Sequence, residues 1–393
     1  MQFVIFATAW RTGGPEALHQ LAQMLQELGH GAGVLYGREQ QGRLVASGCT
    51  TNQYPEYPDL RILAPDDWDP CSPSQRVVVL PEIWAHHALL FAQVHNVLVW
   101  WLSADHGLLS LGRMGADWDH FRSHPNIHHA YQSTYAAGML RSLGLGRIDL
   151  PLSDYISASA TDGSAPSARP EAAGRLAISF NPAKGDWLAE TFRDRHPEVE
   201  WIAIQDMAAE EVRRSLARSH YYLDFGPLPG KDRLPREAIR AGCRVFLRRT
   251  GAGGHADDWR LPTHAYFSAE DCFTGALWTA LQHDSRHGDP ADWQEARCKV
   301  GAERDTFRGE CQAMAAWLGR QGPLSMEQQL LAARLNATVS AGDGVTALIR
   351  DLDQAQQALA AMRSSSSWTL TAPLRRIVGR LRRSPASSLS DRD

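Results

Sequence analysis

Three cationic side chains and a glutamate stand close together in the second half of the chain. Lys231, Arg233 and Arg236 lie within six positions, and Glu237 follows them directly. Grouped cations suit a diphosphate, because ammonium and guanidinium groups form charge-assisted hydrogen bonds with phosphate oxygens. The glutamate beside them is placed to accept hydrogen bonds from ribose hydroxyls. These residue types therefore indicate a site for a phosphorylated ligand.

The surrounding residues predict the elements that position this site. The apolar run 220–225 predicts a strand, the Gly and Pro residues after it predict a loop, and 237–241 predicts a helix closed by Gly242. Backbone N–H groups at a helix entrance favour anions, which also suits a diphosphate. An ordinary helix start is the alternative interpretation, because proline at the first helical position, here Pro235, and an acid in the first turn are common there.

The segment resembles the donor-binding region of group 1 glycosyltransferases of the GT-B type. Glu237-Ala238, Ala241-Gly242 and Val245 match a pattern in which a glutamate heads a helix and precedes a small-residue turn and a Val-rich strand. The usual family has a further glutamate eight positions before the first, where this chain has Pro229. The first acidic contact is therefore missing or supplied by other residues.

The chain opens with a pattern that predicts a βαβ unit. An apolar run at 2–9 is followed by a loop containing Gly13 and Gly14, a helix up to Gly29 and a strand at 33–36. Two glycines permit close approach of the backbone to a ligand, and the loop resembles the glycine loop that faces the donor phosphate in GT-B enzymes. A simple turn is the alternative. The Gly-x-Gly-x-x-Gly fingerprint is absent, which weakens a nicotinamide-dependent enzyme as a further alternative.

Two more candidate residues follow predicted strands. Asp105 comes after the buried run 97–102, where open α/β sheets place their sites, and it suits a general base or a ligand of an acceptor hydroxyl. Capping the next turn is its alternative role. Lys184 follows the strand predicted at 176–180 and could reach a donor phosphate, although a plain surface turn explains it too. Glu82 follows a third predicted strand and begins a helix predicted at 82–94, so it suits either a site or a helix start.

The histidines and cysteines do not indicate a metal site. The chain has sixteen histidines, and the adjacent pairs His86-His87 and His128-His129 are expected to point to different sides of their elements. The six cysteines are dispersed without a Cys-x-x-Cys pair, and an Asp-x-Asp motif is absent. We therefore expect a metal-independent reaction with no cofactor beyond the donor substrate.

Composition places the chain among globular proteins. It has 393 residues, 44% of them hydrophobic and 21% charged, and a net charge of −4. Residues 364–393 hold six arginines and two aspartates, a net charge of +4, which leaves −8 for the rest and argues against nucleic-acid binding. No export signal or membrane-spanning segment is visible, so we expect a cytoplasmic location.

Alternating strands and helices predict an α/β fold in which two Rossmann-like domains face each other across a cleft, the GT-B arrangement. The expected divisions are an acceptor domain at 1–156, a Ser-, Ala- and Pro-rich linker at 157–173, a donor domain at 174–320 and a helical tail at 321–393. Residues 290–318 are expected to be helical and to pack back across both domains.

The tail combines Trp368, an apolar helical face and clustered arginines between Arg375 and Arg383. Such a basic amphipathic helix suits an anionic membrane surface, with a solvated tail as the alternative. The run 367–375 resembles a short motif at the ends of bacterial surface-polysaccharide glycosyltransferases.

The GT-B resemblance implies transfer of a sugar from a nucleotide-sugar donor to a glycan or lipid-linked saccharide acceptor, with retention and at the inner face of a bacterial membrane. It implies that Glu237 orients the donor while Lys231 and Arg233 hold the diphosphate. The alternative is a noncatalytic, membrane-associated binding or partner protein with the same fold, which the proline at 229 favours.

Overall fold

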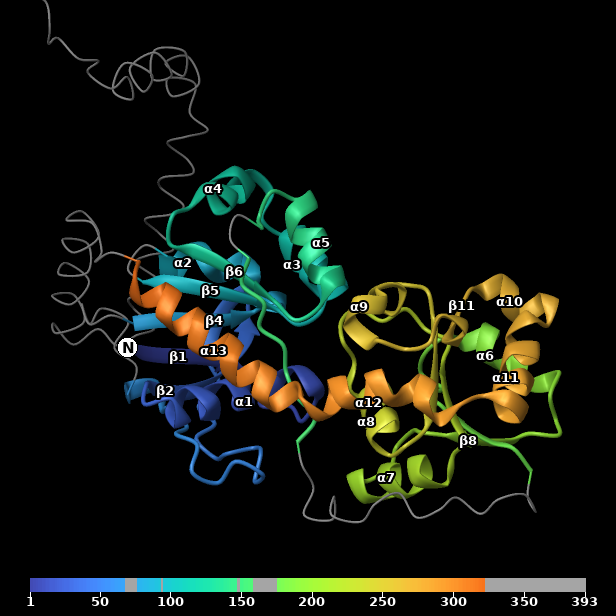
Figure 1. Cartoon of the computed structure of the whole chain (residues 1–393). Helices are drawn as coiled ribbons and strands as arrows, with labels where there is room; N and C mark the ends of the chain where they lie inside the picture. The colour runs from blue at the N-terminus through green and yellow to red at the C-terminus, as the bar shows by residue number, and fades with distance from the viewer. Residues whose placement is uncertain (68–75, 93–94, 147–148, 158–174, 322–393) are drawn as a thin grey trace, which may run out of the picture. The chain divides into compact units, whose positions relative to one another are not determined.

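The computed structural model describes residues 1–67, 76–92, 95–146, 149–157 and 175–321, all of which belong to one compact unit, Met1–Ala332. The predicted linker and tail lie almost wholly outside these residues, and the domain boundaries remain predictions. The described residues form two separate β-sheets with helices on their faces (Figure 1). The α/β fold with two parallel-sheet halves is therefore confirmed.

The first sheet has the strand order β3-β2-β1-β4-β5-β6, and its pairs are parallel except for the β2–β3 hairpin. Its strands are β1 (Gln2–Ala7), β2 (Gly31–Gln40), β3 (Arg43–Ala46), β4 (Arg76–Pro81), β5 (Asn96–Trp101) and β6 (Ile127–Tyr131). Its helices are α1 (Gly13–Glu27), α2 (Ala88–Ala92), α3 (Ala104–Leu111), α4 (Trp118–Ser123) and α5 (Thr134–Ser142). Parallel strands end at one edge of a sheet, so the loops after β1, β4, β5 and β6 meet there.

The second sheet is parallel throughout, with the order β11-β10-β9-β7-β8. Its strands are β7 (Ala177–Phe180), β8 (Glu200–Ala203), β9 (Tyr221–Asp224), β10 (Arg244–Arg248) and β11 (Tyr266–Phe267). Its helices are α6 (Asp186–Asp194), α7 (Ala209–Arg218), α8 (Arg233–Arg240), α9 (Ala256–Trp259), α10 (Ala269–Thr274) and α11 (Ala276–His287).

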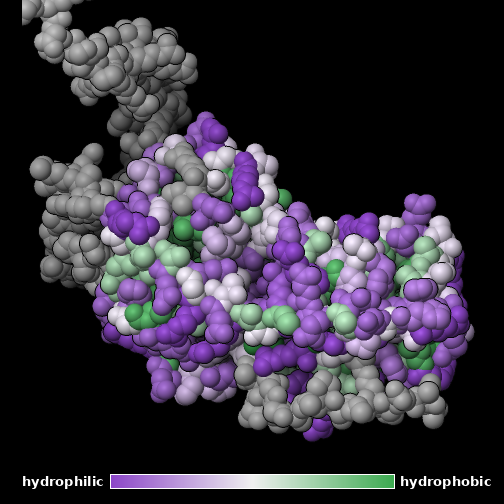
Figure 2. Space-filling model, viewed as in Figure 1, coloured by the Kyte–Doolittle hydropathy of each residue, from purple (hydrophilic) through white to green (hydrophobic). Residues whose placement is uncertain are grey.

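Each sheet has its own apolar core, and two last helices join them. Helix α12 (Gln294–Gly301) contacts α8, whereas α13 (Glu303–Gly319) contacts α1 and buries Phe307, Cys311 and Met314 in the core of the first sheet. Residues 290–318 thus return across both halves, as expected. Hydrophilic side chains dominate the visible surface, with small apolar patches (Figure 2). None of the described helices combines the length and apolarity that crossing a membrane requires.

Two predicted helices differ in detail. Helix α8 begins at Arg233 rather than Glu237, so Pro235 occupies its third position. Proline is tolerated there because N–H groups of the first turn have no partner within the helix. The helix predicted at 82–94 is instead a 3-10 segment, η2 (Glu82–His87), followed by α2, because Trp84 has non-helical backbone angles.

Candidate functional site

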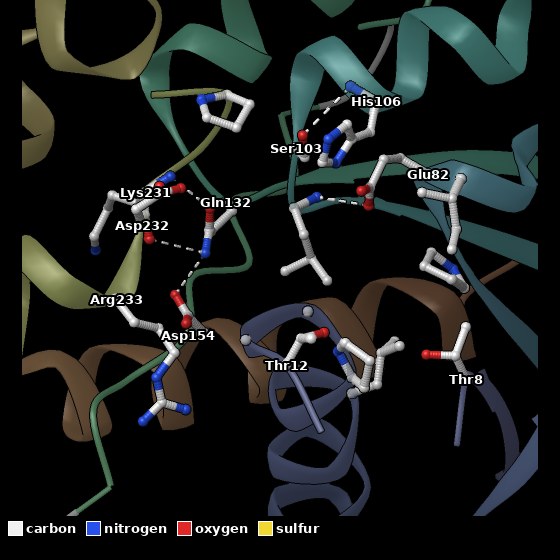
Figure 3. A pocket seen from close by; sticks show the side chains of 18 of the residues that line it. Thr8, Thr12, Glu82, Ser103, His106, Gln132, Asp154, Lys231, Asp232 and Arg233 are labelled. Carbon is white, nitrogen blue, oxygen red and sulfur yellow. Dashed lines mark hydrogen bonds between the residues drawn. The ribbon is translucent and has the colours of Figure 1, made fainter. Parts of the chain in front are cut away.

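A cavity of about 450 Å³ lies where the carboxyl ends of the first sheet meet the loop between β9 and α8 (Figure 3). Each of four strand ends in the first sheet contributes a polar residue: Thr8, Glu82, Ser103 and Gln132. The rest of the lining is Thr12, Gly13, Gly14, Pro15, Leu18, Pro81, Ile83, Leu102, His106, Asp154, Pro229, Lys231, Asp232, Arg233, Leu234 and Arg236. Its volume and mixed lining are those of a small-molecule site.

The glycine turn at the start of α1 forms one wall of this cavity. A Cβ added to Gly13 would lie 3.0 Å from Cδ of Arg233, so a larger residue would push against that side chain. The backbone N–H of Thr12 donates to the Tyr54 hydroxyl, and the N–O distance is 3.0 Å. The structure thus brings the predicted Gly13 and Gly14 directly against the predicted cationic loop.

His19 holds the same turn from behind. Its Nδ1 lies 2.6 Å from the carbonyl oxygen of Pro15, and its Nε2 lies 2.7 Å from the hydroxyl of Tyr36. Burial lowers the pKa of His19 to about 4, so the ring is neutral at physiological pH. The turn is therefore fixed by a neutral hydrogen-bond chain and brings no additional positive charge to the cavity.

Two of the cations form a buried ion-pair network. Arg236 is only 1% exposed and its guanidinium lies 2.7 Å from Asp154 and 3.2 Å from Glu303. Lys231 is 6% exposed, with Nζ 3.1 Å from Glu303. Because Glu303 begins α13, this network ties the loop before α8 to the last described helix. The negative partners already balance these two cations within the protein.

Arg233 is the most accessible of the three cations, with 25% of its side chain exposed. Its guanidinium pairs with Glu16 from the glycine-turn side and, at 3.2 Å, with Glu237 one turn along α8. Glu237 itself is not among the residues that line the cavity. The structure therefore connects Glu237 to the cavity through Arg233.

Lys184 lies behind the cationic loop and forms an ion pair with Asp232, which lines the cavity. Burial lowers the pKa of Lys184. Lys184 is not among the lining residues, so it can influence the cavity only through its ion pair with Asp232.

Gln132 joins the two halves and has no counterpart in the sequence-based predictions. Its Oε1 accepts a hydrogen bond of 2.8 Å from the backbone N–H of Lys231, and its Nε2 donates to Asp154 at 2.8 Å (Figure 3). Its position directly after β6 could have indicated a site residue, because loops at the carboxyl ends of parallel strands form sites in such sheets. Asp154 and Glu303 carry no comparable signal.

Glu82 is a second buried acid that lines the cavity, besides Asp154. Its carboxylate accepts a hydrogen bond of 3.1 Å from the backbone N–H of Leu102. Burial raises its pKa to about 7 and outweighs this bond. A carboxyl group poised near neutrality can give or take a proton, which suits general acid–base chemistry. His106 lines the same wall.

Asp105 lies apart from this wall. Its carboxylate accepts a hydrogen bond of 2.7 Å from the hydroxyl of Tyr135, and it is not among the lining residues. Its catalytic role remains a prediction, and Glu82 is the acid that lines this wall of the cavity.

The prediction that adjacent histidines diverge is correct for one pair and wrong for the other. His128 and His129 lie on β6 and contact different partners, Asn96 and Trp101. The rings of His86 and His87 instead lie with centroids 3.9 Å apart, because η2 is not a regular helix.

Comparison with known proteins identifies the fold. The galactosyltransferase WaaB of the lipopolysaccharide outer core superposes with a TM-score of 0.53 at 10% identity, over 81% of this chain and 99% of that one. The catalytic domain of Arabidopsis thaliana starch synthase IV, bound to ADP and acarbose, gives 0.50 at 13% identity over 80% and 99%. Anabaena HepE in complex with UDP gives 0.50 at 10% identity over 81% and 100%.

No family model and no curated protein matches the sequence. At such low identity the likeness establishes the GT-B fold and leaves substrate and chemistry to the residues of this chain.

Proposed function

We propose that the chain is a glycosyltransferase that moves a sugar from a nucleotide-sugar donor to a glycan or lipid-linked saccharide acceptor. The observation that carries this proposal is the cavity itself: in a GT-B fold, the glycine turn of the first half meets the cationic loop of the second. An N-terminal helix turn and an accessible arginine are complementary to a diphosphate.

On the donor side, Arg233 is the residue best placed to hold the diphosphate, since it is partly exposed and lines the cavity. Lys231 supports the loop from beneath through its ion pair with Glu303, while Glu237 positions Arg233 and, through it, the donor. Starch synthase IV holds ADP and HepE holds UDP, which supports a nucleoside diphosphate sugar as the donor here.

For the chemistry, we propose retention of anomeric configuration without a metal ion. The leaving diphosphate gains negative charge in the transition state, and fixed cations and N–H groups that face this charge lower the barrier. Arg233 and the N–H groups of Gly13 and Gly14 would supply this stabilisation. Glu82 and His106 line the wall on which we place the acceptor.

The test is a melting-temperature panel of the full chain with nucleoside diphosphates and their sugar conjugates, because a ligand of the folded state raises the melting temperature. We expect a rise with one nucleotide, a smaller rise in Glu237→Ala and none in Arg233→Ala. Arg214→Ala, an exposed ion-pair variant on α7, is the matched control. Mass spectrometry of the mixture then detects release of the free nucleoside diphosphate. A full rise and full turnover in Arg233→Ala would place the donor elsewhere.

A noncatalytic binding or partner protein is the second candidate, and one position favours it. Pro229 replaces the further glutamate of the family, and its carbonyl oxygen accepts a hydrogen bond of 2.7 Å from the N–H of Ala104. The loop between β9 and α8 is thus hydrogen-bonded to the first half at the position where the family usually has a glutamate that contacts the donor. Turnover of any nucleotide sugar excludes this candidate, whereas glycan binding without nucleotide supports it.

We also propose that the tail attaches the enzyme to the inner face of a bacterial membrane that carries surface-polysaccharide intermediates. Its clustered arginines attract anionic lipids. Removing residues 364–393 should abolish sedimentation with anionic vesicles and leave nucleotide binding unchanged. If the truncated chain still sediments with anionic vesicles, the tail is not the membrane anchor.

A further inference from the structure

A second cluster of chemically active side chains lies outside the cavity. Glu39 near the end of β2 and the consecutive His86 and His87 at the end of η2 converge on one point. The Nε2 atoms of His86 and His87 lie 2.9 and 3.4 Å from the same oxygen, Oε1 of Glu39. All three ligand-type atoms lie within 4.8 Å of one another. None of the three residues lines the cavity.

These spacings suit a shared cation. Zinc binds imidazole nitrogen and carboxylate oxygen at about 2.0–2.2 Å, so two ligand atoms of one tetrahedral ion lie roughly 3.3 Å apart. The two distances to Glu39 bracket this value. Two histidines and one glutamate are also a known zinc ligand set, in which water completes the coordination.

The surroundings orient the cluster as a metal site requires. His86 Nδ1 lies 2.8 Å from the hydroxyl oxygen of Ser110, and ligating histidines usually use their second nitrogen in this way. Arg113 donates to both carboxylate oxygens of Glu39, at 2.9 and 3.0 Å. Its bond to Oε2 can remain while Oε1 binds a cation, since ligating carboxylates are themselves commonly hydrogen-bonded.

His87 is the least satisfied member of the cluster. Its side chain is 9% exposed, and its Nε2 has no hydrogen-bond partner among the described residues. A buried imidazole nitrogen without a hydrogen bond loses its hydration, and the Glu39 oxygen 3.4 Å away compensates for this loss only weakly. Protonating both rings would not solve this, because two positive imidazoles with centroids 3.9 Å apart repel each other beside Arg113. A metal ion satisfies both nitrogens at once.

We propose that Glu39, His86 and His87 bind a divalent transition-metal ion of the Zn²⁺ class, with water completing the coordination. The ion would fasten the β2–β3 hairpin to η2, the segment whose first residue, Glu82, lines the cavity. The site lies outside the cavity, and its proposal does not depend on the proposed transferase activity.

The test uses the full chain, treated with a chelator and titrated with zinc chloride by calorimetry at neutral pH. We expect one high-affinity Zn²⁺, a rise in melting temperature and loss of both in Glu39→Gln and His87→Ala. The double variant His283→Gln/His287→Gln removes an exposed histidine pair on α11 and is the matched control, which should bind as the parent does. Ser110→Ala should weaken binding roughly 10- to 100-fold.

If His87→Ala fails to fold, the Glu39→Gln variant decides the test. Glu39 is partly exposed, and glutamine has nearly the same size and shape as glutamate. The metal-free Glu39→Gln variant should still unfold cooperatively, at a melting temperature slightly below that of the metal-free parent because it loses the surface ion pair with Arg113. Unchanged zinc affinity in Glu39→Gln, or loss of zinc binding in the α11 control, would overturn the proposal.

Discussion

Replacing Arg236 by alanine tests the buried network beneath the cavity. The substitution leaves Asp154 and Glu303, 4% and 5% exposed, without their guanidinium partner. Breaking a buried pair from one side costs about 3–5 kcal/mol, because a desolvated charge loses its compensation. Lys231 still pairs with Glu303, so the unpaired charge is mainly that of Asp154. We expect the free energy of unfolding in urea to fall by this amount at neutral pH.

The pH dependence identifies the cause of this loss. Burial acts to raise the pKa of Asp154, but the charge and hydrogen bonds of Arg236 outweigh it and lower that pKa. The resulting stability is present above the unfolded pKa and is lost as pH falls through the folded pKa. In the variant, only Lys231 and the hydrogen bond from Gln132 still oppose burial, so the pKa of Asp154 rises and protonation relieves the folded state. The difference between parent and variant should therefore narrow from pH 7 towards pH 4.

Two controls separate this explanation from a packing effect. Arg214 is 74% exposed in a surface ion pair, so Arg214→Ala should change the unfolding free energy by less than about 0.5 kcal/mol. Adding Asp154→Asn to the Arg236→Ala variant removes the unpaired charge and should restore part of the stability. A loss in Arg236→Ala as small as that of Arg214→Ala, or one that does not vary with pH, would refute the reasoning.

Three further outcomes are expected. Burial raises the folded pKa of Glu82 to about 7 from 4.5, so the free energy of unfolding should fall by a total on the order of 3 kcal/mol as pH rises between these values, and Glu82→Gln should remove this fall in urea titrations. Glu16→Gln removes an anion paired with Arg233, so it should tighten nucleoside diphosphate binding about tenfold in calorimetry, equivalent to ~1.4 kcal/mol. A Cβ on Gly230 would lie 2.0 Å from a carbonyl oxygen, so Gly230→Ala should lower the unfolding free energy by about 1–3 kcal/mol, whereas Gly138→Ala in the open face of α5 should raise it by about 0.5–1 kcal/mol.

The fold and part of the site followed from local sequence patterns. Apolar runs alternating with helical spacing predicted both sheets, and the glycine turn and the cationic loop were each recognisable alone. Their meeting depends on contacts between residues more than two hundred positions apart, such as Glu16 with Arg233. No local pattern contains that information. The sequence could also not show that Lys231 and Arg236 would be buried against acids, because Asp154 and Glu303 lie far from them along the chain.

The convergence of His86 and His87 eluded prediction for a different reason. Adjacent side chains diverge in regular helices and strands, and the expectation rested on that rule. The segment departs from regular geometry at Trp84, so the rule does not apply to it. Irregular backbone is therefore where inference from periodicity is weakest.

The internal pairing of the cations changes how ligand binding should be interpreted. A diphosphate entering the cavity exchanges with Glu16 at Arg233, so its measured affinity is the difference between two similar interactions. Weak binding by the parent chain would thus fit both a transferase and a noncatalytic protein. The Glu16→Gln variant distinguishes them, because it removes the competing carboxylate and leaves the cavity wall in place. A cavity built for a diphosphate binds more tightly after this change, whereas one in which Arg233 serves only to join the two halves gains nothing.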